Sequence, residues 1–344
     1  MSTNADDQHL VAGIADRSDA SRIVPAFGHH PWFVHRITAT ETPLPSKEEH
    51  YRSLFPDPPL IDEGMTELEL LMPSLPEPIA LSSVLNELRT RLERYPHSIL
   101  GEVGIDKSFR LPFPPDTWAT LDQIEGKSSG AAAELKESGA AKRRLSRLQT
   151  PIEHQLIIFK AQVDVAISLN RSVSFHSVRA AGTTGELFRE LRSLSNPGFK
   201  SINLDLHSCT LSAETIKQVQ KTHKNIYVSF STTINSRQKG LLEQIDACNP
   251  DRLLSESDWH SAEGLAERVH EIVDLFADSR TLIEHLGIGG LSKSQRVRKI
   301  AEKLRQNWQT FLQGPALVDP DSDEGLSNRQ RKARAKEKAE GRLL

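Results

Sequence analysis

Short apolar segments alternate with longer amphipathic stretches along most of the chain. The apolar segments occupy residues 23–27, 98–101, 172–175, 201–206, 226–231 and 252–255. Their length and their polar boundaries are typical of buried strands. The alternation predicts a parallel sheet whose strands are connected by helices.

The amphipathic stretches predict helices at residues 81–93, 184–194, 212–222, 262–278 and 294–312. The clearest helix follows Pro151, because proline suits a first helical turn and Leu156, Phe159 and Val163 recur at helical spacing. Successive positions at His207, Ser229 and Asp258 are close to one strand–helix repeat apart. This regularity predicts a (β/α)₈ barrel of the TIM type.

Two segments interrupt the pattern, and a third follows it. Residues 43–78 hold many prolines and acidic residues, and we expect them to run over the surface. Residues 107–150 contain prolines, small residues and a basic run, which predicts a flexible insertion. We therefore assign residues 1–314 to the barrel and residues 315–344 to a charged tail. The mixed charges of Lys332–Arg342 favour a solvated helix over a localisation signal or nucleic-acid contact.

Composition argues against a strongly basic nucleic-acid-binding protein, a disulfide-rich secreted protein and a membrane protein. The chain has 344 residues, 37% of them hydrophobic, and a net charge of −3, so it has no global basic footprint for nucleic acid. Cys209 and Cys248 are too few for a disulfide framework, which favours a reducing compartment. Neither a signal peptide nor a transmembrane-length apolar run is present. We expect a soluble cytoplasmic or nuclear protein that does not interact with membranes.

Four of the predicted strands end in residues that bind divalent metals. These residues are Glu102, His176, His207 and Asp258. In a (β/α)₈ barrel the carboxyl ends of the strands meet at one face, so we expect these side chains to converge. A mixed set of carboxylate and imidazole ligands suits Zn²⁺, Mn²⁺ or Mg²⁺.

Each of these residues also has a structural alternative. Glu102 could cap the turn that follows it, and Asp258 could cap a helix near Ser261. His176 and His207 could be hydrogen-bonded core histidines. Their placement at equivalent strand ends favours metal binding for both.

Four further residues are candidates or neighbours of the site. His30 and Arg179 are candidate contacts to a substrate phosphate, although packing beside Trp32 and a surface ion pair explain them equally well. Asp106 is expected to hold a turn rather than a metal. Side chains alternate along a strand, so Glu256 should point away from the site if Asp258 points into it.

Together these motifs resemble the TatD family of metal-dependent hydrolases, in particular its fungal branch. The resemblance covers about residues 8–312, and its motifs lie in family order. They are Gly28-His29-His30-Pro31-Trp32, Gly101-Glu102-Val103-Gly104-Ile105-Asp106, Val173-Ser174-Phe175-His176-Ser177-Val178-Arg179, Leu206-His207-Ser208 and Arg252-Leu253-Leu254-Ser255-Glu256-Ser257-Asp258.

The resemblance implies metal-dependent hydrolysis of phosphodiesters, usually DNA. It implies that Glu102 anchors one or two divalent ions (Zn, Mn or Mg) and that His176 and His207 complete their coordination. It also implies that Asp258 is catalytic, because it orients the attacking water and takes its proton.

One family element is missing. The family carries a His-x-His pair on its first strand, and this chain has no such pair. When the motifs are placed in the family's order, the family's first strand and most of its second strand have no counterpart. The expected barrel is therefore incomplete at its N-terminal side. A truncated isoform or misassigned start and a genuine pseudo-hydrolase both explain this. We expect at most one well-bound metal and weak or no nuclease activity.

Two other functions stay open. The fungal branch includes an interactor of a helical-repeat subunit of the cell-cycle ubiquitin ligase, so the chain could be an adaptor that has lost catalysis. Residues 107–150 and the charged tail would then be its contact surfaces. An amidohydrolase acting on a small amide or lactone shares the barrel, but we find no candidate for the strand-borne lysine that many such enzymes carry.

Overall fold

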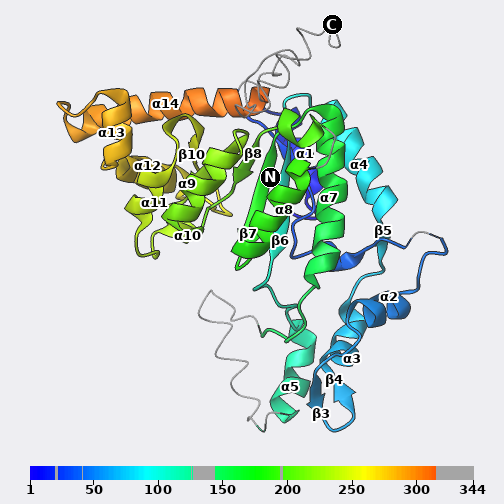
Figure 1. Cartoon of the computed structure of the whole chain (residues 1–344). Helices are drawn as coiled ribbons and strands as arrows, with labels where there is room; N and C mark the ends of the chain where they lie inside the picture. Colours follow the sequence, from blue (N-terminus) through cyan, green and yellow to red (C-terminus); the bar gives the residue numbers. More distant parts are fainter. Residues whose placement is uncertain (20–21, 41, 125, 127–143, 194–196, 315–344) are drawn as a thin grey trace, which may run out of the picture.

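The computed structural model describes residues 1–19, 22–40, 42–124, 126, 144–193 and 197–314. Its main element is a parallel sheet with the strand order β1-β6-β7-β8-β9-β10 (Figure 1). The strands are β1 (Ala26–Phe27), β6 (Ile99–Asp106), β7 (Val173–Val178), β8 (Leu204–Leu206), β9 (Ile226–Phe230) and β10 (Leu253–Ser255). All six predicted strands are therefore confirmed, with β1 shorter and β6 longer than expected.

Helices connect these strands and cover the sheet. They are α4 (Leu81–Arg94), α7 (Ile152–Leu169), α8 (Ala181–Ser193), α9 (Ala213–Thr222), α11 (Leu241–Ala247), α12 (Leu265–Phe276), α13 (Arg280–Leu286) and α14 (Lys293–Gln313). The core between sheet and helices is apolar, and Phe159 of α7 packs against Phe175 of β7. This parallel arrangement is the TIM-type architecture that the sequence predicts.

In the described part of the chain the sheet is open, with β1 and β10 as its end strands. The backbone of Met1–Thr3 lies against the strands at the β1 end. Ser2 donates to the Ala26 carbonyl at 2.9 Å and accepts from the Glu102 amide at 3.3 Å. The six parallel strands are consistent with a TIM-type sheet that is not closed among the described residues. No described helix combines the length and the hydropathy needed to cross a bilayer.

Helix α14 lies across the amino-terminal ends of the strands. Ser172 and Asn203, which immediately precede β7 and β8, both hydrogen-bond to the Phe311 carbonyl. Asn307 donates to the Leu253 carbonyl at the start of β10. This end of the sheet is thus covered, and the carboxyl ends face the other way.

The prediction that residues 43–78 only run over the surface is wrong. They form α2 (Lys47–Leu54), a β3–β4 hairpin (Leu60–Asp62 and Met65–Thr66) and α3 (Glu67–Leu71). Together with α5 (Trp118–Ile124) they make a second unit below the sheet in Figure 1. We call this the insertion unit. Its core joins both interrupting segments through Tyr51, Leu54, Phe55, Leu68, Leu71, Leu75, Leu111, Phe113, Leu121 and Leu148.

The described part of residues 107–150 makes contacts within itself and with residues 43–78. Pro112 pairs with Leu145 in an isolated bridge, and Arg147 forms an ion pair with the buried Glu67 at 2.8 Å. The small-residue run from Ser128 to Ala133 and the tail after Gly314 lie outside the described residues.

Gly104 allows β6 and β7 to approach closely beside the site. A Cβ atom at this position would lie 2.0 Å from the His176 carbonyl oxygen, and the residue has a φ of +151°. We expect Gly104→Ala to lower the free energy of unfolding by roughly 1–3 kcal/mol or more, because the strands must separate. Urea unfolding followed by circular dichroism measures this change.

Gly182→Ala is the matched control, since nothing lies within 4 Å of its added Cβ atom in α8. It should change stability by no more than about 1 kcal/mol. Equal unfolding midpoints for the two variants would contradict the close approach at Gly104.

Candidate metal centre

Glu102 enters the site from a bulge in β6. Leu100 pairs with Val173 and Val103 pairs with Phe175, so β6 has one more residue than β7 between these pairs. A bulge of this kind re-aims a side chain without ending the strand. The Glu102 side chain is buried.

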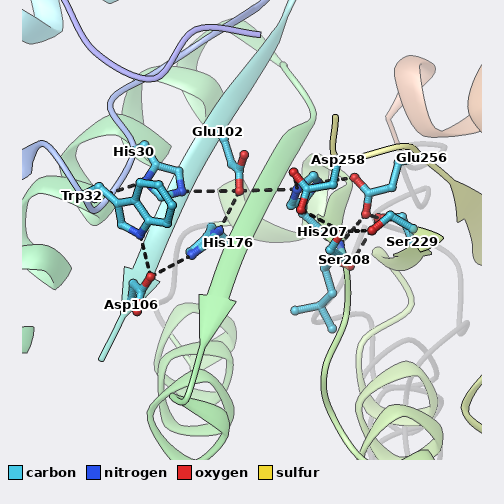
Figure 2. Close-up of polar contacts among 12 residues, drawn as sticks. His30, Trp32, Glu102, Asp106, His176, His207, Ser208, Ser229, Glu256 and Asp258 are labelled. Carbon is cyan, nitrogen blue, oxygen red and sulfur yellow. Dashed lines mark hydrogen bonds and ion pairs between the residues drawn. The ribbon is translucent and has the colours of Figure 1, made fainter. Parts of the chain in front are cut away.

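Three imidazoles surround one oxygen of Glu102 (Figure 2). His176 Nδ1 lies 2.7 Å from Glu102 Oε1, His207 Nε2 lies 3.5 Å from it, and His30 Nε2 lies 3.6 Å from it. Ligand atoms of His30, Glu102 and His176 all lie within 4.8 Å of one another. His176 within β7, His207 directly after β8 and His30 in the segment after β1 therefore converge on Glu102.

His176 is held from its far side by Asp106. His176 Nε2 lies 3.3 Å from Asp106 Oδ2, and the same oxygen accepts a 2.6 Å hydrogen bond from the Trp32 indole. The other carboxylate oxygen of Asp106 accepts from the Ser108 and Phe109 amides. Asp106 holds the turn as predicted, and it also fixes which ring nitrogen of His176 faces Glu102.

The prediction that Glu256 points away from the site is wrong. Glu256 Oε2 contacts His207 Nδ1, and Glu256 Oε1 accepts from the Ser208 amide and, at 2.9 Å, from the Ser229 hydroxyl. Strand β10 ends at Ser255, so the alternation of side chains does not extend to Glu256. Ser229 also donates to the buried Asp205 at 2.7 Å.

Asp258 lies at the solvent-exposed side of the cluster around Glu102. Its Oδ1 is 3.6 Å from His207 Nε2, and its side chain is 33% exposed, against 12% for Glu102. Asp258 has a φ of +45° and does not cap a helix; α12 begins after Gly264. Arg179 is exposed in the turn after β7, and among the described residues its side chain has no ion pair or hydrogen bond.

The charges of this group depend on one another. Burial alone would raise the pKa of Glu102, but the His207 charge and hydrogen bonds from His176 and His30 bring it well below its usual value. Burial would lower the pKa of His207, but Glu256 and Glu102 raise it well above its usual value. In His30 burial dominates and lowers the pKa. A positive charge on His207, from a proton or from a bound cation, would offset the negative charge of Glu102 and Glu256.

Burial and the Glu256 charge raise the pKa of the fully buried Asp205 carboxyl. The Ser229 hydroxyl carries one hydrogen and lies between Asp205 and Glu256, so it can donate to only one of them at a time. A protonated Asp205 can donate to Ser229, which then donates to Glu256. The two carboxyl groups can therefore be buried together.

The residues fit a divalent cation. His207 Nε2 is buried and has no hydrogen-bond partner, although it faces Glu102 and Asp258. Imidazole nitrogens and carboxylate oxygens are suitable donors for Zn²⁺ and Mn²⁺. A bound cation would replace the proton as the counter-charge, because metal ligands must be deprotonated.

The structure brings together Glu102, His176, His207 and Asp258, as well as His30, but it leaves Arg179 apart from them. The sequence prediction missed the supporting contacts of Trp32, Asp205, Ser208 and Ser229. Adjacent polar residues at strand ends were the available signal for Ser208 and Asp205. Nothing in the sequence pattern indicated that Ser229 bridges two carboxyl groups.

Several known proteins are similar to this chain in sequence or in fold. The family model described as TatD-related DNase matches residues 1–312. The chain is 28% identical over 317 residues to Cut9-interacting protein scn1 of Schizosaccharomyces pombe, which covers 82% of this chain and 84% of the relative. It is 27% identical over 240 residues to the uncharacterized deoxyribonuclease YMR262W of Saccharomyces cerevisiae, covering 68% and 66% respectively.

Solved structures of similar fold include a bacterial homolog. The crystal structure of YJJV, a TatD homolog from Escherichia coli, matches with a TM-score of 0.51 at 14% identity. The match covers 92% of this chain and 85% of that structure. At this identity the similarity supports the TIM-type fold.

We expect the purified chain to bind Zn²⁺ or Mn²⁺ through Glu102. Glu102→Gln should raise the dissociation constant at least about tenfold, because it removes the charge around which the imidazoles converge. Isothermal titration of metal-free protein measures this. Glu186→Gln, an exposed site on α8, is the control and should bind as the wild type does. Unchanged affinity in Glu102→Gln would contradict a metal centre here.

Proposed function

This chain belongs to the TatD-related DNase family, and from that membership we propose that it is a metal-dependent phosphodiester hydrolase. The observation that carries the proposal is the convergence of His30, His176 and His207 on the Glu102 carboxylate. Such a cluster, at the carboxyl ends of parallel strands, occupies the position of active sites in TIM-type barrels.

The charge of the chain favours a site that recognises phosphate through a cation. Its net charge is −3, so a general basic surface does not supply attraction for a polyanion. A bound divalent ion supplies Lewis acidity toward a phosphoryl oxygen and lowers the pKa of water. Glu102, His176 and His207 are the residues that would hold it.

Asp258 is suited to accept a proton during hydrolysis. It is the most exposed carboxylate of the group, and its Oδ1 faces His207 Nε2. Ser208 donates a 3.4 Å hydrogen bond to its other oxygen, Oδ2. We assign Asp258 the role of orienting water and receiving its proton, as the family resemblance implies.

We propose that one cation binds well and that hydrolysis is slow. The described donor atoms are arranged around a single carboxylate oxygen, Glu102 Oε1, which suits one ion better than two. His30 would then be a ligand or a contact to the substrate phosphate.

DNA is the substrate that the relatives favour, since one of them is named as a deoxyribonuclease. We also propose a cytoplasmic or nuclear location. Cys209 and Cys248 are both buried and unpaired, which fits a reducing compartment.

Asp258→Asn should lower the rate of DNA hydrolysis with Mn²⁺ by roughly 10²–10⁴-fold, because it removes the general base. Its affinity for the cation should change much less than that of Glu102→Gln. A fluorescent oligonucleotide assay measures the rate. Asp164→Asn, at an exposed position on α7, is the control.

The experiment has a clear negative outcome. If wild-type activity is absent with Mn²⁺, Zn²⁺ and Mg²⁺, or if Asp258→Asn is as active as the wild type, the proposed hydrolase mechanism is wrong.

An adaptor role is the second candidate, and the name of the Schizosaccharomyces pombe relative favours it. The insertion unit offers a surface for such a role. Leu60 on β3 is 65% exposed and Leu145 is 42% exposed. Both line one cavity of about 270 Å³ on the insertion unit, together with Phe113 and Leu121.

If the adaptor role is correct, the chain binds the counterpart of Cut9 in its own organism through the insertion unit. The double variant Leu60→Asp/Leu145→Asp should weaken this binding at least about tenfold, since charges replace apolar contacts. Surface plasmon resonance with purified proteins measures it. Leu10→Asp is the control, because Leu10 is similarly exposed (58%) but lies on α1 (Gln8–Asp16), outside the insertion unit. Asp258→Asn should bind normally.

A further inference from the structure

We propose that Glu256 is a positioning residue that orients His207 toward the metal centre, and that Ser208 and Ser229 fix Glu256 in this role. The inference rests on the metal centre of the proposed function. It concerns how His207 is presented to the cation, not the hydrolysis that follows.

The first step is the contact between the two side chains. Glu256 Oε2 touches His207 Nδ1, while the opposite ring nitrogen, Nε2, faces Glu102 Oε1 at 3.5 Å and Asp258 Oδ1 at 3.6 Å. A carboxylate can only accept a hydrogen bond, so it places the imidazole hydrogen on Nδ1. The lone pair of neutral His207 is then on Nε2, the atom that faces the site.

The second step is that Glu256 cannot easily turn away. Its other oxygen, Oε1, accepts from the Ser208 backbone amide and from the Ser229 hydroxyl at 2.9 Å. Ser229 is buried on β9 and Ser208 directly follows His207, so two neighbouring strand ends hold the carboxylate. Carboxylate partners of metal-binding histidines tune affinity in this way in other proteins.

The third step is a comparison within the site. His176 is arranged in the opposite sense: its Nδ1 faces Glu102 and its Nε2 faces Asp106. Asp106 is itself held by Trp32 and by a turn. Each histidine therefore has its own carboxylate behind it, and the two carboxylates determine which nitrogen is presented.

Glu256→Gln tests the proposal with little change in shape. Its amide oxygen would stay with the donors Ser208 and Ser229, so its NH₂ group would face His207 Nδ1. That group donates, which moves the ring hydrogen to Nε2 and blocks the lone pair. We expect the dissociation constant for Zn²⁺ to rise roughly 10–100-fold in isothermal titration.

A second measurement separates orientation from folding. Nitrogen NMR of ¹⁵N-histidine-labelled, metal-free protein, at a pH where His207 is neutral, should show its hydrogen on Nδ1 in the wild type and on Nε2 in Glu256→Gln. Ser229→Ala keeps the carboxylate and should raise the dissociation constant less than about tenfold. Glu263→Gln, an exposed residue in the loop after Asp258, should change neither measurement.

The outcomes distinguish the two proposals. Zinc binding that is weakened in Glu256→Gln supports this inference even if the wild type hydrolyses no DNA, in which case only the proposed function fails. Unchanged affinity or an unchanged ring hydrogen in Glu256→Gln overturns this inference alone. A wild-type chain that binds no divalent ion overturns both.

Discussion

The site depends on the burial of several carboxylates and imidazoles around Glu102. A buried charge without a partner is costly, so each of these groups must be compensated by another. Glu102 is compensated by three imidazoles, and His207 in turn by Glu102 and Glu256. The group is therefore a single electrostatic unit, and removal of one member changes the state of the others. A divalent cation satisfies the same requirement more fully than a proton does.

The fold places the polar cluster around Glu102 at the carboxyl ends of the strands, apart from the apolar core and from α14. Helix α14 covers the amino-terminal ends of β7, β8 and β10, and the apolar core fills the space between sheet and helices. The carboxyl ends are left for polar residues. The bulge in β6 and the missing side chain at Gly104 then bring Glu102 and His176 together. Backbone irregularity is thus concentrated where the polar side chains meet.

The sequence predicted the strands and helices well, because their apolar periodicity is strong. It also predicted that Glu102, His176, His207 and Asp258 converge, since parallel strands place their ends at one face. It failed for residues 43–78, where short helices are stabilised by contacts with a distant segment rather than by local periodicity. It failed for Glu256 because alternation was applied beyond the end of β10. Such errors arise where tertiary contacts, not neighbouring residues, decide the conformation.

The insertion unit has a core built from two stretches separated in sequence by α4 and β6. Both stretches contribute to this core, and the buried Glu67 of one pairs with Arg147 of the other. The two halves therefore depend on each other: shortening one loop would expose the apolar side of its counterpart to water.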